Sequence, residues 1–180
     1  MQPTDVDIEE EFELLSATIG RFVALREEGP ATLKLRADSV SGWSVEQHLY
    51  HIALATDLAF RNVRSLVAGK GRLIVEEGEI GDEAAAVLRD RATRRGVAKA
   101  PRMVTPDADV DPEFLAMELT GIRGGLETLR GSAEAIREAP HWIPHQILGP
   151  LSAAHWLRFA TMHANHHLSI VDDVLAAARG

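Results

Sequence analysis

Apolar residues recur at alternating steps of three and four along four segments of this chain, which is the spacing of one face of an α-helix. The segments cover about residues 4–28, 44–69, 111–136 and 152–178. No segment shows strand alternation with hairpin turn signals. Four long amphipathic helices have to bury their apolar stripes against one another, and the compact solution is a four-helix bundle. The sequence therefore predicts an all-α fold, with residues 1–180 in one domain.

Local signals mark where the second and third helices begin and end. Ser44, followed three residues later by Gln47, forms a capping box, and Gly69 is a natural stop for the same helix. Asp111 followed by Pro112 is an N-cap with proline at the first helical position. These signals place both helices on the chain independently of their apolar stripes.

One long connection, about residues 70–110, separates the second helix from the third. Residues 82–92, with the sequence DEAAAVLRDRA, are a candidate for a short additional helix, and a loop follows them. A connection of this length is able to span a bundle. We therefore expect a crossover between helices two and three.

The charge balance argues against a nucleic-acid partner. The chain carries 19 basic and 27 acidic residues, a net charge of −8, whereas phosphate binding needs a basic face. Basic residues do gather in one stretch, at Arg89, Arg91, Arg94, Arg95, Lys99 and Arg102. We interpret this stretch as solvated surface, with a small anion site as the alternative.

Other features favour a soluble, cytoplasmic protein without a membrane partner. The N-terminus is acidic and has no apolar signal core, and no run approaches the roughly 18 apolar residues that a membrane span requires. The chain contains no cysteine, which excludes disulfides, thiolate zinc sites and cysteine nucleophiles.

Three histidines fall within five residues in the sequence HANHH, at positions 163–167. His163 and His167 lie one helical turn apart in the middle of the apolar stripe of the fourth helix, His166 lies at its edge, and Asn165 points away. Burying two imidazoles costs free energy unless their nitrogens find partners. A shared metal ion is one such partner. Hydrogen bonds to neighbouring helices are the alternative.

A third ligand has to come from another helix, and the second helix offers His48 and His51. The helical angles slightly favour His48, because it lies nearly opposite the polar side whereas His51 lies at its flank. His141 and His145 fall in a loop punctuated by proline and glycine, where we expect structural roles. The choice between His48 and His51 stays open on angles alone.

Three stretches, GWSVEQHLYHIA, HQILGPLSAAHWLRF and MHANHHLSIVDDVL, together resemble the DinB/YfiT-like superfamily of metal-binding helical bundles. The resemblance matches Trp43 to the family tryptophan, His51 to the histidine eight positions later, and His163 and His167 to the late pair. It therefore implies His51 as the third metal ligand. It also implies a four-helix bundle with a long crossover, commonly as a homodimer.

Three neutral imidazoles leave metal positions open for water or substrate, and they suit zinc, nickel, iron or copper. We expect zinc or nickel first and iron as a further possibility. Family members include transferases that use low-molecular-weight thiols, and others described only as metal-dependent hydrolases. The resemblance thus implies a metal-dependent enzyme that adds a small thiol to a small-molecule electrophile. The alternatives are a hydrolase and a non-catalytic metal-binding or dimerising protein.

Several further residues are weaker candidates for this site. His48 or His166 is a candidate general base, and Lys99 and Arg102 are candidates for contacts with an anionic thiol. Trp142 is a candidate to line a pocket mouth, although a packing role is the alternative. The carboxylates near in sequence that are candidates to orient the histidines are Asp57, Asp172 and Asp173, and solvated helix-face charge is the alternative for each.

Overall fold

The four long helices each begin at a side chain that caps the first turn. Asp7 accepts a hydrogen bond from the backbone N–H of Glu10, and Ser152 accepts one from the N–H of His155. Ser44 and Gln47 form the predicted capping box, and Asp111 caps the third long helix as predicted. The helices are α1 (Ile8–Glu27), α3 (Val45–Ala68), α5 (Pro112–Arg130) and α7 (Ala153–Arg179).

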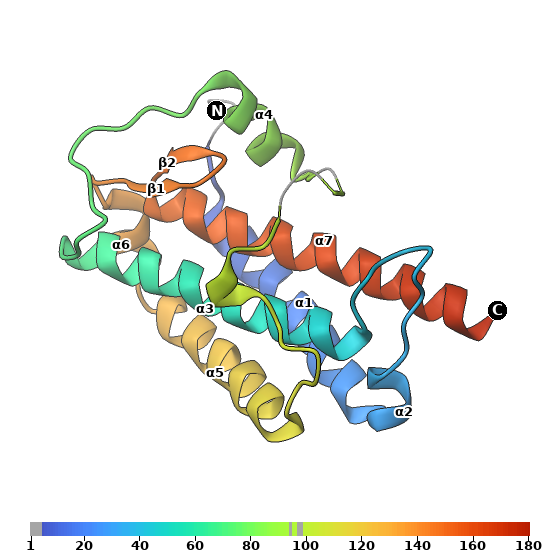
Figure 1. Ribbon diagram of the computed structural model, residues 1–180. Helices are drawn as coiled ribbons and strands as arrows, with labels where there is room; N and C mark the ends of the chain where they lie inside the picture. The colour runs from blue at the N-terminus through green and yellow to red at the C-terminus, as the bar shows by residue number, and fades with distance from the viewer. Residues whose placement is uncertain (1–4, 94, 97–98) are drawn as a thin grey trace.

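A computed structural model describes residues 5–93, 95–96 and 99–180, and in it the four long helices lie side by side as a bundle (Figure 1). The all-α fold predicted from the apolar stripes is confirmed. The predicted start of the first helix, near residue 4, falls outside the described residues, whereas the cap at Asp7 lies within them.

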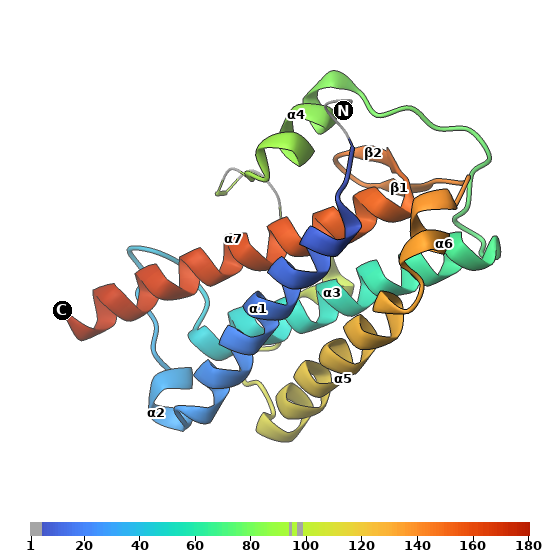
Figure 2. The same cartoon turned by 180° about the vertical axis from the view of Figure 1, so that it is seen from behind.

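Side-chain pairs fix the direction of each helix. α1 and α7 run parallel, because the residue numbers of their ion pairs increase along both helices. These pairs are Glu11–Arg158, Arg21–Asp172 and Glu28–Arg179. α5 runs antiparallel to α1, because Arg130 at its end pairs with Glu13 near the start of α1. Figure 2 shows α1 lying across the bundle between α7 and α5.

α3 runs antiparallel to α7, because His48 contacts His167 while His51, further along α3, contacts His163. α3 and α5 are therefore parallel to each other, and the chain between them has to return along the bundle. This return contains α4 (Asp82–Asp90) and the 3₁₀ turn η1 (Arg102–Val104). The predicted crossover and its short extra helix are both confirmed.

Three short elements differ from the sequence-based expectation. The stripe expected to continue to about residue 136 breaks after Arg130, and a separate helix α6 (Ala133–Glu138) follows Gly131. A hairpin of β1 (Ile143–His145) and β2 (Gly149–Leu151) replaces the expected loop. Its strands have three residues each, which is too short for an alternation signal. A one-turn helix, α2 (Pro30–Leu33), follows α1.

The core is built from the apolar stripes of the four long helices. Phe12 and Phe22 of α1 and Phe60 of α3 are fully buried. Gly125 of α5 faces the Phe60 ring so closely that an added Cβ would lie 3.0 Å from it. A glycine here lets α5 approach α3 without displacing that ring.

A buried ion pair joins α1 to α7 at the end of the bundle beneath α4. Glu11 is fully buried, and its Oε1 accepts a hydrogen bond from Arg158 at 2.7 Å and forms an ion pair with Arg91 at 2.8 Å. Arg158 is itself buried and also donates to the backbone carbonyl of Asp5. The ion pair with Glu11 anchors Arg91, the C-cap residue of α4, on the bundle.

Acidic neighbours neutralise much of the basic stretch that the sequence displays. Arg89 pairs with Asp90, Arg91 with Glu10 and Glu11, and Arg95 with Asp173. Arg94 lies outside the described residues. For the three arginines with such partners, the ion pairs favour the interpretation of charged surface over an anion site.

Within the described part of the chain, none of the helices combines the length and the apolarity needed to cross a lipid bilayer.

Replacing Arg158 with Met should lower the free energy of unfolding by about 3 kcal/mol, because Glu11 then keeps a buried charge with one partner fewer. Arg179→Met is the matched control. It removes the exposed pair with Glu28 and should cost far less free energy than Arg158→Met, because solvent screens an exposed pair. Urea denaturation of both variants measures the two losses. Equal losses would contradict a special role for the buried pair.

Candidate metal centre

Three histidines meet where α3 faces α7. His51 projects from α3, and His163 and His167 project from α7, with one ring nitrogen from each within 4.8 Å of the others. His51 and His167 are buried and His163 is half-buried. Among the described residues, no carboxylate belongs to this group. The structure thus brings together the three histidines that the family resemblance implied, and it leaves His48 beside them.

A backbone carbonyl fixes the tautomer of His51. Its Nδ1 lies 2.7 Å from the carbonyl oxygen of Val104, the last residue of η1. Because a carbonyl oxygen only accepts, Nδ1 has to carry the proton, and Nε2 keeps its lone pair. The crossover, which passes in front of α3 and α7 in Figure 1, therefore orients one ring of the cluster.

His163 is held by aromatic contacts on both sides. Its ring stacks on Phe159, one turn earlier on α7, at a centroid distance of 5.3 Å and an interplanar angle of 17°. Its edges meet the rings of His51 and His167 at 84° and 89°. These contacts restrict the ring to one orientation facing the other two histidines.

Trp43, the residue before the N-cap of α3, covers the cluster. Its ring lies 5.0 Å from His51, 5.4 Å from His48 and 6.2 Å from His167, measured between centroids. A residue before the N-cap that packs on the fourth helical residue, here His48, is a staple that fixes how the chain enters the helix. Trp43 thereby limits the access of water from this side.

Burial keeps the imidazoles neutral. Desolvation lowers the pKa of His163 to about 3, and it also lowers the pKa values of His51 and His167, the last with a further contribution from the neighbouring histidines. For His51, the hydrogen bond to Val104 opposes part of this effect. Neutral imidazole is the form that binds metal.

The residues present fit a divalent transition metal. The donors are three neutral imidazole nitrogens that converge from two helices, and His51 has its other nitrogen already bound to a carbonyl, as is usual for metal-ligating histidines. Three protein ligands with no carboxylate leave at least one coordination position for an exogenous group.

The family model of the DinB superfamily matches residues 14–171 of this chain. The chain belongs to the DinB superfamily. The match includes His51, His163 and His167 and most of the bundle. No curated protein and no solved structure matches the chain in the same comparisons.

The other candidates of this DinB-superfamily chain lie in different surroundings. His48 is buried against His167, and His166 is half-buried at 5.3 Å from the His167 ring. Lys99 and Arg102 are exposed on the crossover, Arg102 as the first residue of η1.

Trp142 packs into the body of the protein rather than facing the cluster. It forms a backbone bridge with Val75, covers Gly78 and stacks on His155, two helical turns before His163. An added Cβ at Gly78 would lie 2.7 Å from the Trp142 ring. These contacts favour the packing role.

The carboxylates considered as orienting groups pair with arginines instead. Asp57 binds Arg61 and Arg64, Asp172 binds Arg21, and Asp173 binds Arg95. The polar groups that contact the cluster are the Val104 carbonyl and His48. The backbone carbonyl has no signature in the sequence. Phe159, by contrast, lies four residues before His163, and that spacing places it on the same helix face.

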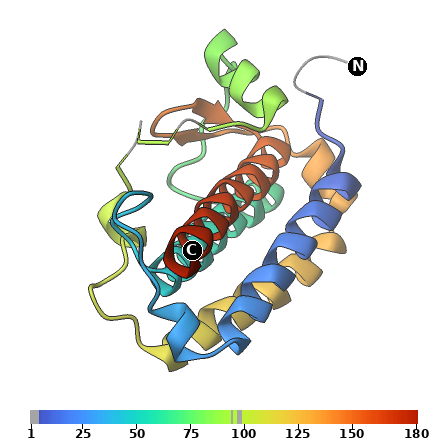
Figure 3. The same cartoon turned by 90° about the vertical axis from the view of Figure 1, so that its right-hand side faces the viewer.

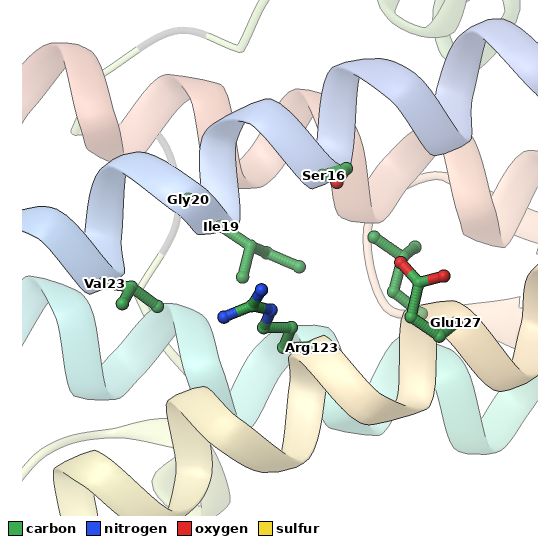
Figure 4. Close-up of a pocket in the computed structure, with 7 residues that line it drawn as sticks. Ser16, Ile19, Gly20, Val23, Arg123 and Glu127 are labelled. Carbon is green, nitrogen blue, oxygen red and sulfur yellow. The ribbon is translucent and has the colours of Figure 1, made fainter.

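A hollow of about 300 Å³ lies between α1 and α5, away from the α3–α7 contact (Figure 4). Its lining residues are Ser16, Ile19, Gly20, Val23, Arg123, Leu126 and Glu127. The hollow contains none of the cluster histidines. We therefore place the candidate site at the histidine cluster rather than in this hollow.

His145 provides a pH-dependent contribution to stability that is separate from the cluster. Its Nδ1 accepts hydrogen bonds from the backbone N–H groups of Ile147 and Leu148, and burial lowers its pKa to about 4. The unfolded chain, with a histidine pKa of about 6.5, binds the proton more readily. The free energy of unfolding should therefore fall as the pH drops from about 6.5 to about 4.

His145→Asn should remove about 2 kcal/mol of that acid-induced loss, because the amide oxygen still accepts the two hydrogen bonds but does not titrate. The measurement is urea denaturation at pH 7.5 and pH 4.5 in the presence of a chelator. An unchanged difference between the two pH values would show that His145 does not contribute.

Proposed function

We propose that this DinB-superfamily chain is a metal-dependent enzyme whose divalent transition metal is held by His51, His163 and His167, and that it joins a small thiol to an electrophilic small molecule. The observation that carries the proposal is the charge of the donor set. All three donors are neutral imidazoles, and Asp57, Asp172 and Asp173 are engaged with arginines.

A neutral donor set leaves the full charge of a divalent ion to be balanced by an exogenous anion. A thiolate suits this role, because soft sulfur ligands favour zinc and related ions. A bound ion would supply Lewis acidity, which lowers the pKa of a thiol in an open coordination position. The chain has no cysteine, so the sulfur nucleophile has to come from the substrate side.

The residues of the chain orient the donors and limit the access of water. The Val104 carbonyl holds the proton of His51 on Nδ1, and Phe159 holds the ring of His163. Trp43 covers three of the neighbouring imidazoles. Hydrolysis would need a general base beside the metal. The three aspartates named above are each paired with arginine, which leaves His48 and His166, both beside His167, as the candidates for that base.

Single substitutions of the three histidines by Ala should each abolish stoichiometric metal binding, because two imidazoles do not complete the site. His141→Ala is the control and should retain about one equivalent, since His141 lies outside the cluster. The measurement is elemental mass spectrometry of untagged protein after reconstitution with zinc, nickel or iron. Circular dichroism checks that the variants remain folded. Metal retained in His163→Ala would overturn the assignment.

The thiol step is tested with the metal-loaded protein, a panel of low-molecular-weight thiols and a chromogenic aryl halide. We expect a thioether product, with the thiol proton and halide released, and we expect product formation to disappear in His167→Ala. The product is identified by mass spectrometry. Hydrolysis of the electrophile without incorporation of sulfur would instead favour a metal-dependent hydrolase.

A further inference from the structure

His48 lies beside the candidate ligands, and both of its ring nitrogens are engaged. Its Nδ1 lies 2.9 Å from Nδ1 of His167, and its Nε2 lies 2.9 Å from the hydroxyl oxygen of Ser41. That hydroxyl oxygen also accepts a hydrogen bond from the backbone N–H of Trp43. His48 is only 2 % exposed, so water does not substitute readily for these partners.

Two proton arrangements are compatible with this chain of hydrogen bonds. In the first, His167 Nδ1–H donates to His48 Nδ1, and His48 Nε2–H donates to Ser41. His167 then keeps a lone pair on Nε2. In the second, Ser41 donates to His48 Nε2, and His48 Nδ1–H donates to His167 Nδ1. The proton of His167 then occupies Nε2, which has no lone pair left for a metal.

We propose that His48 is a positioning residue, whose Nδ1 accepts the Nδ1–H of His167 and so holds the Nε2 lone pair of His167 ready for the metal. This inference rests on the proposed metal site. Ser41 completes the arrangement by accepting the remaining proton of His48. His48 does for His167 what the Val104 carbonyl does for His51.

His48 differs from the carbonyl in one respect that has a consequence for binding. A carbonyl only accepts, so His51 is committed to one tautomer, whereas an imidazole donates or accepts. The metal-free protein therefore has access to both arrangements of His167. Metal binding selects the first, and the free energy of that selection is part of the affinity. Replacing His48 by a side chain that only accepts a hydrogen bond, or by one that only packs, should therefore change the affinity for the metal.

The test compares wild type with His48→Leu and His48→Asn. Leu removes the acceptor but keeps an apolar side chain in the buried position. Asn keeps an amide oxygen near the position of the imidazole Nδ1. The affinity for Zn²⁺ is measured by competition with a chromophoric chelator, and the visible absorption bands of the Co²⁺ form report the ligand geometry. Denaturation of the metal-free proteins measures any general loss of stability.

We expect His48→Leu to bind Zn²⁺ about 10- to 100-fold more weakly and to shift the Co²⁺ bands. His48→Asn should recover most of the affinity. His155→Leu is the control for the loss of a buried histidine outside the cluster, and it should leave both readouts unchanged. A merely structural role of His48 would lower stability without the rescue by Asn.

Two results would overturn the inference while leaving the metal site intact: His48→Leu with wild-type affinity and an unshifted Co²⁺ spectrum, or His48→Asn as weak as His48→Leu. Failure of the wild-type protein to bind Zn²⁺ or Co²⁺ would overturn the proposed function and this inference together. The wild-type titration therefore separates failure of the proposed function from failure of this inference.

Discussion

The antiparallel contact between α3 and α7 is the interaction on which the candidate site depends. It brings His51 against His163 and His167, which are more than 110 positions away in the sequence. Because α5 also runs antiparallel to α7, α3 and α5 are parallel, and the connection between them has to return along the bundle. Viewed along α7, Figure 3 shows α3 beside it and η1 on the side away from α1. The crossover thus connects α3 to α5, and it also contains the backbone carbonyl that orients His51.

Burial of the three cluster imidazoles favours their neutral form, because burying a charged imidazole costs free energy. Desolvation lowers the pKa of each of the three, so their nitrogens stay neutral. Each then has one proton to place. The acceptor of this proton is a backbone carbonyl for His51 and another histidine for His167. This difference between a fixed and an adjustable partner is what gives His48 a role that packing alone does not.

Carboxylates and arginines are paired away from the cluster. Glu11 and Arg158 join α1 to α7 at one end of the bundle, and Arg179 and Glu28 join them at the other. Asp173 is paired with Arg95. The histidine cluster is consequently a neutral donor set within a chain of net charge −8. Such a set favours an anionic exogenous ligand once a cation is bound, which is the physical basis of the thiol proposal.

Spacing and short motifs in the sequence were enough to predict the four long helices, the caps at Ser44 and Asp111, the extra helix in the crossover, and the shared face of His163 and His167. These depend on spacing and short-range hydrogen bonds, which a sequence records directly. The helical angles favour His48 as the partner of the late pair, whereas the family resemblance implies His51. The structure groups His51 with that pair; the two histidines lie three positions apart on α3, so a small rotation of the helix would exchange them. Only the tertiary structure decided the hairpin at 143–151 and the partners of His51 and His48, since a backbone carbonyl and a distant hydroxyl leave no periodic signal.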